Sequence, residues 1–129
     1  MGYRSEVGIV FKKSDEDLFY DKLREWDASH IEDGESAEEL LEYANKETLY
    51  SNSLNEDCVV LSWTYVKWYD TYPAVQFFED VKRYINIDFV RIGEEVGDIE
   101  DDPALGAEIV SYYTEAHLMI EDDLVNIRY

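Results

Sequence analysis

The chain has 129 residues, of which 46% are hydrophobic and 15% aromatic, and this is enough for the core of one domain without metals or disulfides. Its formal charge of −20, from 31 Asp and Glu against 11 Lys and Arg, disfavours nonspecific binding to nucleic acid or to an anionic membrane. The single cysteine, Cys58, excludes an intrachain disulfide and indicates a buried thiol in a reducing cytoplasm, and no apolar run is long enough to span a bilayer.

The start of the chain predicts one strand followed by one helix. Over residues 3–13 apolar side chains alternate with the others, which is typical of a half-buried strand. Ser14 precedes three acids and a run of apolar residues at helical spacing, so we expect it to cap a helix over residues 15–26. The polar residues 27–35 predict a loop after this helix.

A second, short helix should follow the loop. Ser36 and Glu39 have the spacing of a capping box, in which each side chain binds the backbone N–H of the other residue. Residues 47–53 could extend this helix or form a short strand, and we favour the strand.

The most strongly apolar elements lie in the centre of the chain. Residues 58–69 are apolar or aromatic on both faces, as in a strand interior to a sheet. Pro73 begins an amphipathic helix over residues 73–85 with a wide apolar stripe. Residues 88–92 predict a further strand, which Gly93 ends.

The rest of the chain predicts mainly strands. Residues 94–102 form an acidic loop or an edge hairpin, and residues 108–114 and 116–120 indicate a final hairpin, for which a helix is the alternative. The order of elements favours a single α+β domain over residues 1–129. We expect a mainly antiparallel sheet with helices on one face, as a ferredoxin-like core with a C-terminal β-hairpin.

The excess of acid lies outside the central segment. Residues 14–57 have a net charge of −12 and residues 94–129 of −10, whereas residues 58–93 are neutral. Three explanations are open. The acids could be solvated faces that keep the protein soluble, an adaptation to a salty cytoplasm, or imitations of nucleic-acid phosphates that bind a basic groove on a partner.

No motif identifies a reaction. His30 and His117 lack the spacing of metal ligands, and the acidic run that begins at Asp98 lacks the Gly and Glu of a calcium loop. The aromatic residues of 63–72 suggest a base-stacking platform, but Lys67 is the only base among them, so core packing or a protein-binding surface explains them better. We therefore expect no enzyme activity, no cofactor and no metal site.

Three blocks of the sequence stand out, MGYRSEV at 1–7, LSW and VKWY within 61–69, and FVRIGE at 89–94 with DIE at 98–100. These blocks resemble small acidic proteins of bacteriophages that have no assigned activity as a group. The resemblance provides no catalytic residues. It implies an accessory protein in the cytoplasm of a bacterial host, a class in which acidic DNA mimics act against restriction or CRISPR complexes.

The resulting prediction is a non-enzymatic protein that binds a basic, nucleic-acid-binding host protein or complex and has no direct contact with nucleic acid. The alternative is a phage structural or assembly module that self-associates through a sheet edge and exposed Tyr and Trp, for example as a homodimer. An enzyme with a carboxylate site is a third reading. The predicted binding residues form two acidic clusters, Glu32, Asp33, Glu35, Glu38, Glu39 and Glu42, and Glu94, Glu95, Asp98, Glu100, Asp101 and Asp102.

Overall fold

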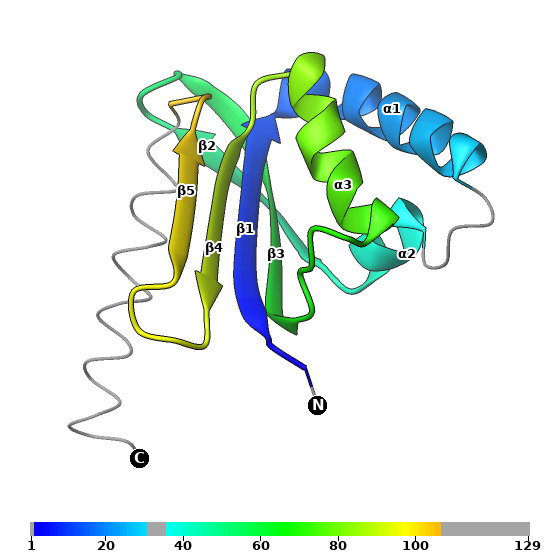
Figure 1. The fold of residues 1–129 in the computed structure, drawn as a ribbon. Helices are drawn as coiled ribbons and strands as arrows, with labels where there is room; N and C mark the ends of the chain where they lie inside the picture. Colours follow the sequence, from blue (N-terminus) through cyan, green and yellow to red (C-terminus); the bar gives the residue numbers. More distant parts are fainter. Residues whose placement is uncertain (1, 31–35, 107–129) are drawn as a thin grey trace.

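The computed structural model describes residues 2–30 and 36–106 (Figure 1). The final hairpin predicted over 108–114 and 116–120 lies outside this range. In chain order the elements are β1 (Ser5–Lys12), α1 (Glu16–Ser29), α2 (Ala37–Glu42), β2 (Asn45–Ser51), β3 (Glu56–Val66), α3 (Pro73–Asp80), β4 (Asp88–Gly93) and β5 (Ile99–Pro103), with 3-10 turns at Lys13–Asp15 and Val81–Arg83.

The five strands form one antiparallel sheet in the order β2-β3-β1-β4-β5. β3 lies between β1 and β2 in the sheet, and β1 lies between β3 and β4. These two interlocked units are the ferredoxin-like core, to which β5 adds an edge strand. Figure 1 shows the helices together on one face of the sheet. The predicted α+β fold is therefore confirmed.

Aromatic side chains join the helices to the sheet. Phe11 of β1 stacks on Phe19 of α1 with their ring centroids 4.4 Å apart, and Phe19 meets the edge of Phe77 of α3 at 5.5 Å. All three rings are fully buried. Aromatic pairs of this kind add to the free energy gained from burial alone, so α1 and α3 are both fixed over the centre of the sheet.

The face of the sheet away from the helices is also apolar. Val10 of β1 is 2% exposed, so the expectation that β1 is half-buried is wrong: the residue alternating with Ile9 and Phe11 is itself buried. Cys58 lies in the same cluster, and burial raises the pKa of its thiol. The predicted buried thiol is confirmed. The cluster consists of Val10, Cys58, Val60, Val90, Ile92 and Leu105.

β3 ends at Val66, three residues before the predicted end, where it pairs with Ser5, the first residue of β1, and a bulge lies just before this end. The register shifts between Ser5 and Val7, where β3 contains one residue more than β1. Tyr65 in this bulge has a φ of 57°, in the left-handed region that non-glycine residues seldom adopt. The bulge turns the chain out of the sheet towards α3.

The bulge also changes which side chains share a face. Strict alternation over residues 58–69 places Trp63 and Trp68 on opposite faces. Instead their ring centroids lie 5.1 Å apart on the helical side, and Trp68 lies 5.2 Å from Phe78 of α3. This error follows from the extra residue, which the sequence pattern does not reveal.

The first helix begins and ends later than expected. Ser14 does not cap it but lies inside the preceding 3-10 turn, and Asp15 is the N-cap residue, without a side-chain capping bond. α1 continues to Ser29, where a loop was predicted. Trp26 lies in this last part of α1, and its Nε1 donates to the carbonyl oxygen of Pro73 at 3.1 Å, which ties the helix to the start of α3.

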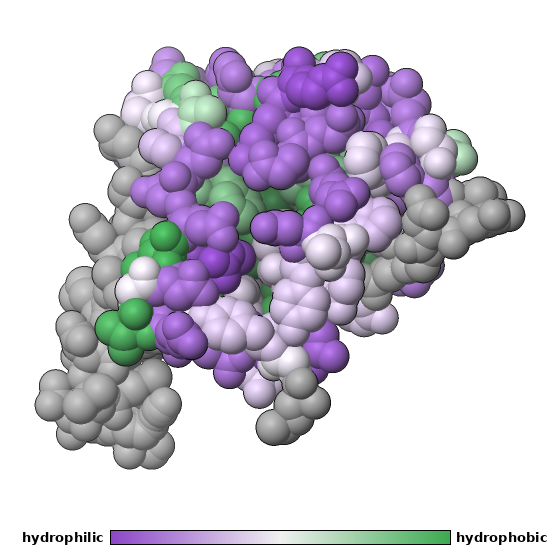
Figure 2. All heavy atoms as spheres, in the orientation of Figure 1, coloured by the Kyte–Doolittle hydropathy of each residue, from purple (hydrophilic) through white to green (hydrophobic). Residues whose placement is uncertain are grey.

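The two edges of the sheet differ in character. Residues 45–51 form β2, as the favoured strand interpretation predicts, and six of the seven are exposed. The acidic segment forms a hairpin, in which β5 pairs with β4. β5 is short, carries three successive acids and ends on Pro103, features that hinder pairing with another sheet. Figure 2 shows that the molecular surface in the same orientation as Figure 1 is mostly hydrophilic.

Candidate functional site

The α2 cluster lies on a helix whose first turn is closely fixed. Ser36 Oγ accepts from the backbone N–H of Glu39 at 3.0 Å, which confirms half of the predicted capping box. A second cap comes from α1: the carboxylate of Asp27 accepts from the N–H of Ala37 at 2.8 Å and of Glu38 at 3.0 Å. These bonds satisfy the N–H groups that a helix start leaves unpaired.

The acids of α2 point away from the core. Ala37 and Leu40 are buried beneath the helix, whereas Glu38, Glu39 and Glu42 are exposed and form no ion pair with any residue that the structure describes. The other members of the first predicted cluster, Glu32, Asp33 and Glu35, lie outside the described residues. Thus α2 presents three carboxylates whose charge no neighbouring base offsets in the described part of the chain.

Bases partly neutralise the second predicted cluster. Arg91 Nη2 lies 2.7 Å from Asp98 and 2.6 Å from Glu100, and Lys82 Nζ lies 3.2 Å from Asp102. The guanidinium also donates to both carboxylate oxygens of Asp98. Hydrogen bonds from Arg91, and then from Tyr3, hold the pKa of Asp98 below its ordinary value. These three acids therefore have structural partners.

The other acids of the second cluster form no ion pair with the described residues. Glu94 accepts from the backbone N–H of Arg4 at 2.6 Å. Glu95 and Asp101 are exposed and have no ion pair within the described ranges. Figure 1 places the β4–β5 turn and α2 on opposite sides of β1, so the described members of the two predicted clusters do not form one group.

A hydrogen-bonded junction forms where the chain enters β1. The backbone N–H of Tyr3 donates to Tyr69 Oη at 2.8 Å, and the Tyr3 hydroxyl donates to Asp98 and accepts from the N–H of Glu95. The bond to Asp98 is the main cause that raises the pKa of Tyr3. Gly93 leaves room for this junction, because a Cβ there would overlap the Asp98 carboxylate and the Tyr3 hydroxyl.

This junction brings together residues from the sequence blocks at 1–7, 61–69 and 89–100. Tyr3 comes from the first block, Tyr69 from the second, and Asp98 from the third. Arg91 of the third block also donates to Ser5 of the first at 3.0 Å. Residues far apart in the sequence thus build one end of the sheet, and Glu95 and Asp98 of the second acidic cluster are part of it.

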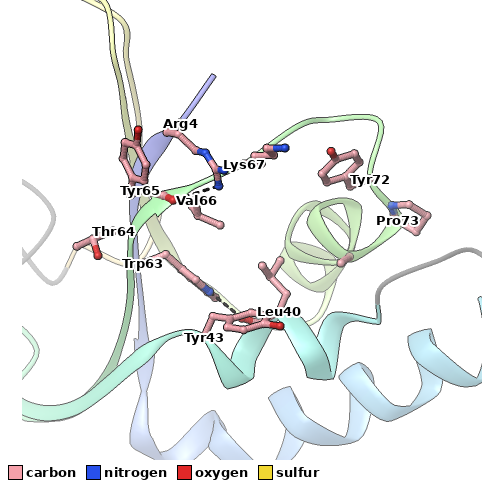
Figure 3. Close-up of a pocket in the computed structure, with 11 residues that line it drawn as sticks. Arg4, Leu40, Tyr43, Trp63, Thr64, Tyr65, Val66, Lys67, Tyr72 and Pro73 are labelled. Atoms are coloured by element: carbon pink, nitrogen blue, oxygen red, sulfur yellow. Dashed lines mark hydrogen bonds between the residues drawn. The ribbon is translucent and has the colours of Figure 1, made fainter. Parts of the chain in front are cut away.

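A pocket of about 680 Å³ opens beside the junction. Figure 3 shows Arg4, Lys67 and Tyr72 on one side of it, with Leu40 and Tyr43 opposite them. Trp63 contributes to the wall, and its Nε1 donates to the carbonyl oxygen of Leu40 at 2.8 Å, which ties α2 to β3. The lining residues are Arg4, Leu40, Tyr43, Trp63, Thr64, Tyr65, Val66, Lys67, Tyr72, Pro73 and Ala74.

The sequence reasoning did not identify Arg4 and Lys67 as site residues. Both bases line the pocket, and neither forms an ion pair with a carboxylate of the described residues. With Lys67 as its only base, the aromatic run of residues 63–72 is too weakly basic to predict a binding platform. The pairing of β1 with β3 adds Arg4 to the same pocket, and this pairing is not visible in the sequence. Arg4 lies in the sequence block at 1–7 and Lys67 in the block at 61–69.

The candidate metal ligands do not gather in the described part of the chain. Residues 2–30 and 36–106 contain no group of three or more His, Cys, Asp or Glu that could hold a metal ion, and no helix there is long and apolar enough to cross a membrane. His30 stacks on Trp26 with the ring centroids 4.0 Å apart, and its Nδ1 lies 2.8 Å from the carbonyl oxygen of Trp26. His117 lies outside the described residues.

Comparison of the chain with protein-family models, curated proteins and solved structures gives no match.

Proposed function

We propose that this protein is a non-enzymatic inhibitor or interaction protein that presents carboxylates in place of nucleic-acid phosphates to a basic partner. The observation that supports this function best is the α2 surface, where Glu38, Glu39 and Glu42 are exposed without ion pairs to described residues. The partner would be a nucleic-acid-binding complex of host defence, such as a restriction or CRISPR complex, as the resemblance to phage proteins suggests.

The spacing on α2 suits such a role. Glu38 and Glu42 are four residues apart on the helix, which separates their Cβ atoms by about 5–6 Å. A groove that binds duplex DNA meets one charge per about 1.7 Å of helix axis from two strands, so closely spaced charges are needed. The double cap from Ser36 and Asp27 fixes the helix before binding, which reduces the ordering cost of association.

Charge reversal on α2 tests this function. The variant E38K/E39K/E42K changes the net charge by six units on one helix. The control E47K/D57K/D70K makes the same change at exposed acids elsewhere that have no ion pair to described residues. Immobilised wild type should capture a nucleic-acid-binding protein from nuclease-treated bacterial lysate, and the control should still do so.

The α2 variant should lose this capture. With the captured protein purified, the slope of log affinity against log salt should fall by about three, since each phosphate-like contact contributes about 0.9. The same partner bound equally well by the α2 variant would refute the role of this helix. Capture of no nucleic-acid-binding protein by wild type would refute the function.

A second function, self-association through a sheet edge, is favoured by β2. This edge strand is exposed over most of its length, and Leu49 and Tyr50 on it are 41% and 54% exposed. A dimer formed by such apolar and backbone contacts should persist at high salt, whereas an assembly driven by charge should dissociate. Sedimentation at about 0.05 and 1 M NaCl distinguishes them, and L49K should dissolve an edge-paired dimer. A monomer at both salt concentrations excludes this second function.

A further inference from the structure

We propose that the pocket beside the β1 junction binds a small dianion that carries an aromatic ring, of the class of the nucleoside monophosphates. This site goes beyond the protein-binding function proposed above. It uses cations rather than carboxylates.

The first support is an imbalance in how the bases are paired. Ten Lys and Arg residues lie in the described ranges. Arg4 and Lys67, the two that form no ion pair there, line the same pocket. In a chain with 31 acids, a base is expected to have an acid within ion-pairing distance. The pocket differs from the rest of the described surface because its two bases have none. The eight paired bases are Lys12, Lys13, Lys22, Arg24, Lys46, Lys82, Arg83 and Arg91.

Arg4 is positioned without being neutralised. Its guanidinium carbon lies 5.2 Å from the centroid of the Tyr65 ring, and its Nη1 lies 3.5 Å from the carbonyl oxygen of the same residue. The left-handed backbone of Tyr65 at the bulge places this residue beside Arg4. A cation–π contact holds a guanidinium but leaves its charge and most of its N–H donors available to an anion.

Lys67 passes close to the start of the chain. A Cβ at Gly2 would lie 2.9 Å from Lys67 Cε and also too close to the Tyr69 hydroxyl. Gly2 therefore allows the N-terminal segment to run against the Lys67 side chain. In Figure 3 the ammonium group of Lys67 lies between Arg4 and Tyr72, at the side of the pocket where an anion would meet both cations.

The charge of the site favours a phosphate monoester over a carboxylate. Two cations held in one pocket repel each other, and a dianion offsets both, whereas a carboxylate offsets only one. Arginine matches phosphate through two parallel N–H donors, and lysine binds it as a point charge. The structure thus provides both of the usual phosphate-binding cations.

The walls favour an aromatic ring on the same ligand. Tyr43 is 70% exposed and Tyr72 is 40% exposed, and both line the pocket, whereas Figure 3 shows the Tyr65 ring pointing away from it. Stacking on such rings is how proteins bind bases without hydrogen-bond readout. The volume of about 680 Å³ lies inside the range of roughly 300–1,000 Å³ for small-molecule sites.

The surrounding acids limit the ligand to a small one. A long polyanion would cross the carboxylates of the rest of the surface and be repelled. A ligand confined to the pocket meets fewer of these carboxylates, of which Glu94 accepts from the backbone N–H of Arg4 at 2.6 Å. A single nucleotide therefore fits the charge distribution, and a nucleic-acid chain does not.

Calorimetric titration of the full-length protein with adenosine 5′-monophosphate tests this proposal, with adenosine and inorganic phosphate as separate probes. Wild type should bind the monophosphate at least about tenfold more tightly than either part alone, since ring and phosphate each contribute. R4Q/K67Q should weaken binding by about 50-fold or more, and Y43A by about fivefold.

The control K12Q/K46Q removes the same charge at bases that are paired elsewhere and should bind within about twofold of wild type. Far-UV circular dichroism checks that each variant is folded. No binding by wild type at millimolar monophosphate overturns the proposal, as does equal binding by R4Q/K67Q. If adenosine binds as tightly as the monophosphate, the proposed recognition of the phosphate is wrong. If inorganic phosphate binds as tightly as the monophosphate, the proposed stacking of an aromatic ring is wrong. None of these results depends on a protein partner.

Discussion

The indole of Trp63 should stabilise the fold by more than the burial of its ring alone provides, because its hydrogen bond also ties α2 to the sheet beside the pocket. The side chain is 1% exposed, and its Nε1 donates to the carbonyl oxygen of Leu40 at 2.8 Å. The substitution W63F keeps one aromatic ring but removes this donor. A lost buried hydrogen bond costs about 1 kcal/mol, and the missing carbon atoms add about as much, so we expect a loss of about 2 kcal/mol in the free energy of unfolding.

The matched control is W68F. Trp68 is also buried, but its indole donates no hydrogen bond to another described residue, so only the volume term of about 1 kcal/mol should be lost. Urea unfolding followed by far-UV circular dichroism measures both. With a typical slope of about 1–3 kcal/mol per molar urea, W63F should lower the midpoint by roughly 1 M and W68F by about half as much. Equal losses in the two variants would refute the argument from the hydrogen bond.

Three further predictions concern the junction and the edge hairpin. G93A should lower the free energy of unfolding by about 1–3 kcal/mol, because its Cβ overlaps the Asp98 and Tyr3 side chains; an unchanged urea midpoint would contradict this. The pKa of Asp98 is lower in the folded than in the unfolded protein, so this carboxylate stabilises the fold above about pH 4 and loses that contribution as the pH falls through the folded pKa. Between about pH 5 and 2 the midpoint temperature of thermal unfolding should therefore decline less in D98N than in wild type. Asp88 is fully buried and accepts from the N–H of Leu105 at 2.7 Å and of Gly106 at 3.0 Å, so D88A should cost about 3 kcal/mol and D88N, which keeps an acceptor, clearly less, as compared by urea unfolding.

The sequence was sufficient for the fold because local and long-range signals agree. Apolar alternation, the helical stripe after Pro73 and the order of elements together predict an antiparallel sheet with helices on one face, and the structure has this form. Two of the failures occur where one residue alters the local geometry. The bulge at Tyr65 moves Trp68 to the helical side, and the 3-10 turn that contains Ser14 delays α1 by one residue.

The site was harder to predict because its parts are distant in the sequence. Counting acids by segment finds the charged regions but cannot show that Arg91 neutralises Asp98 or that Lys82 neutralises Asp102. Nor does any local pattern join Arg4 to Lys67, since only the pairing of β1 with β3 brings them to one pocket. Pairing between strands, rather than composition, decides which charges remain available for binding.

The most direct test of nucleic-acid mimicry is competition for the captured partner. The purified partner, bound to this protein, is titrated with duplex DNA that it binds, and the complexes are followed by sedimentation velocity. Imitation of phosphates predicts that DNA and this protein exclude each other, so that DNA releases the protein as it binds. A ternary complex of partner, DNA and this protein, with the DNA affinity unchanged, would contradict the proposed function.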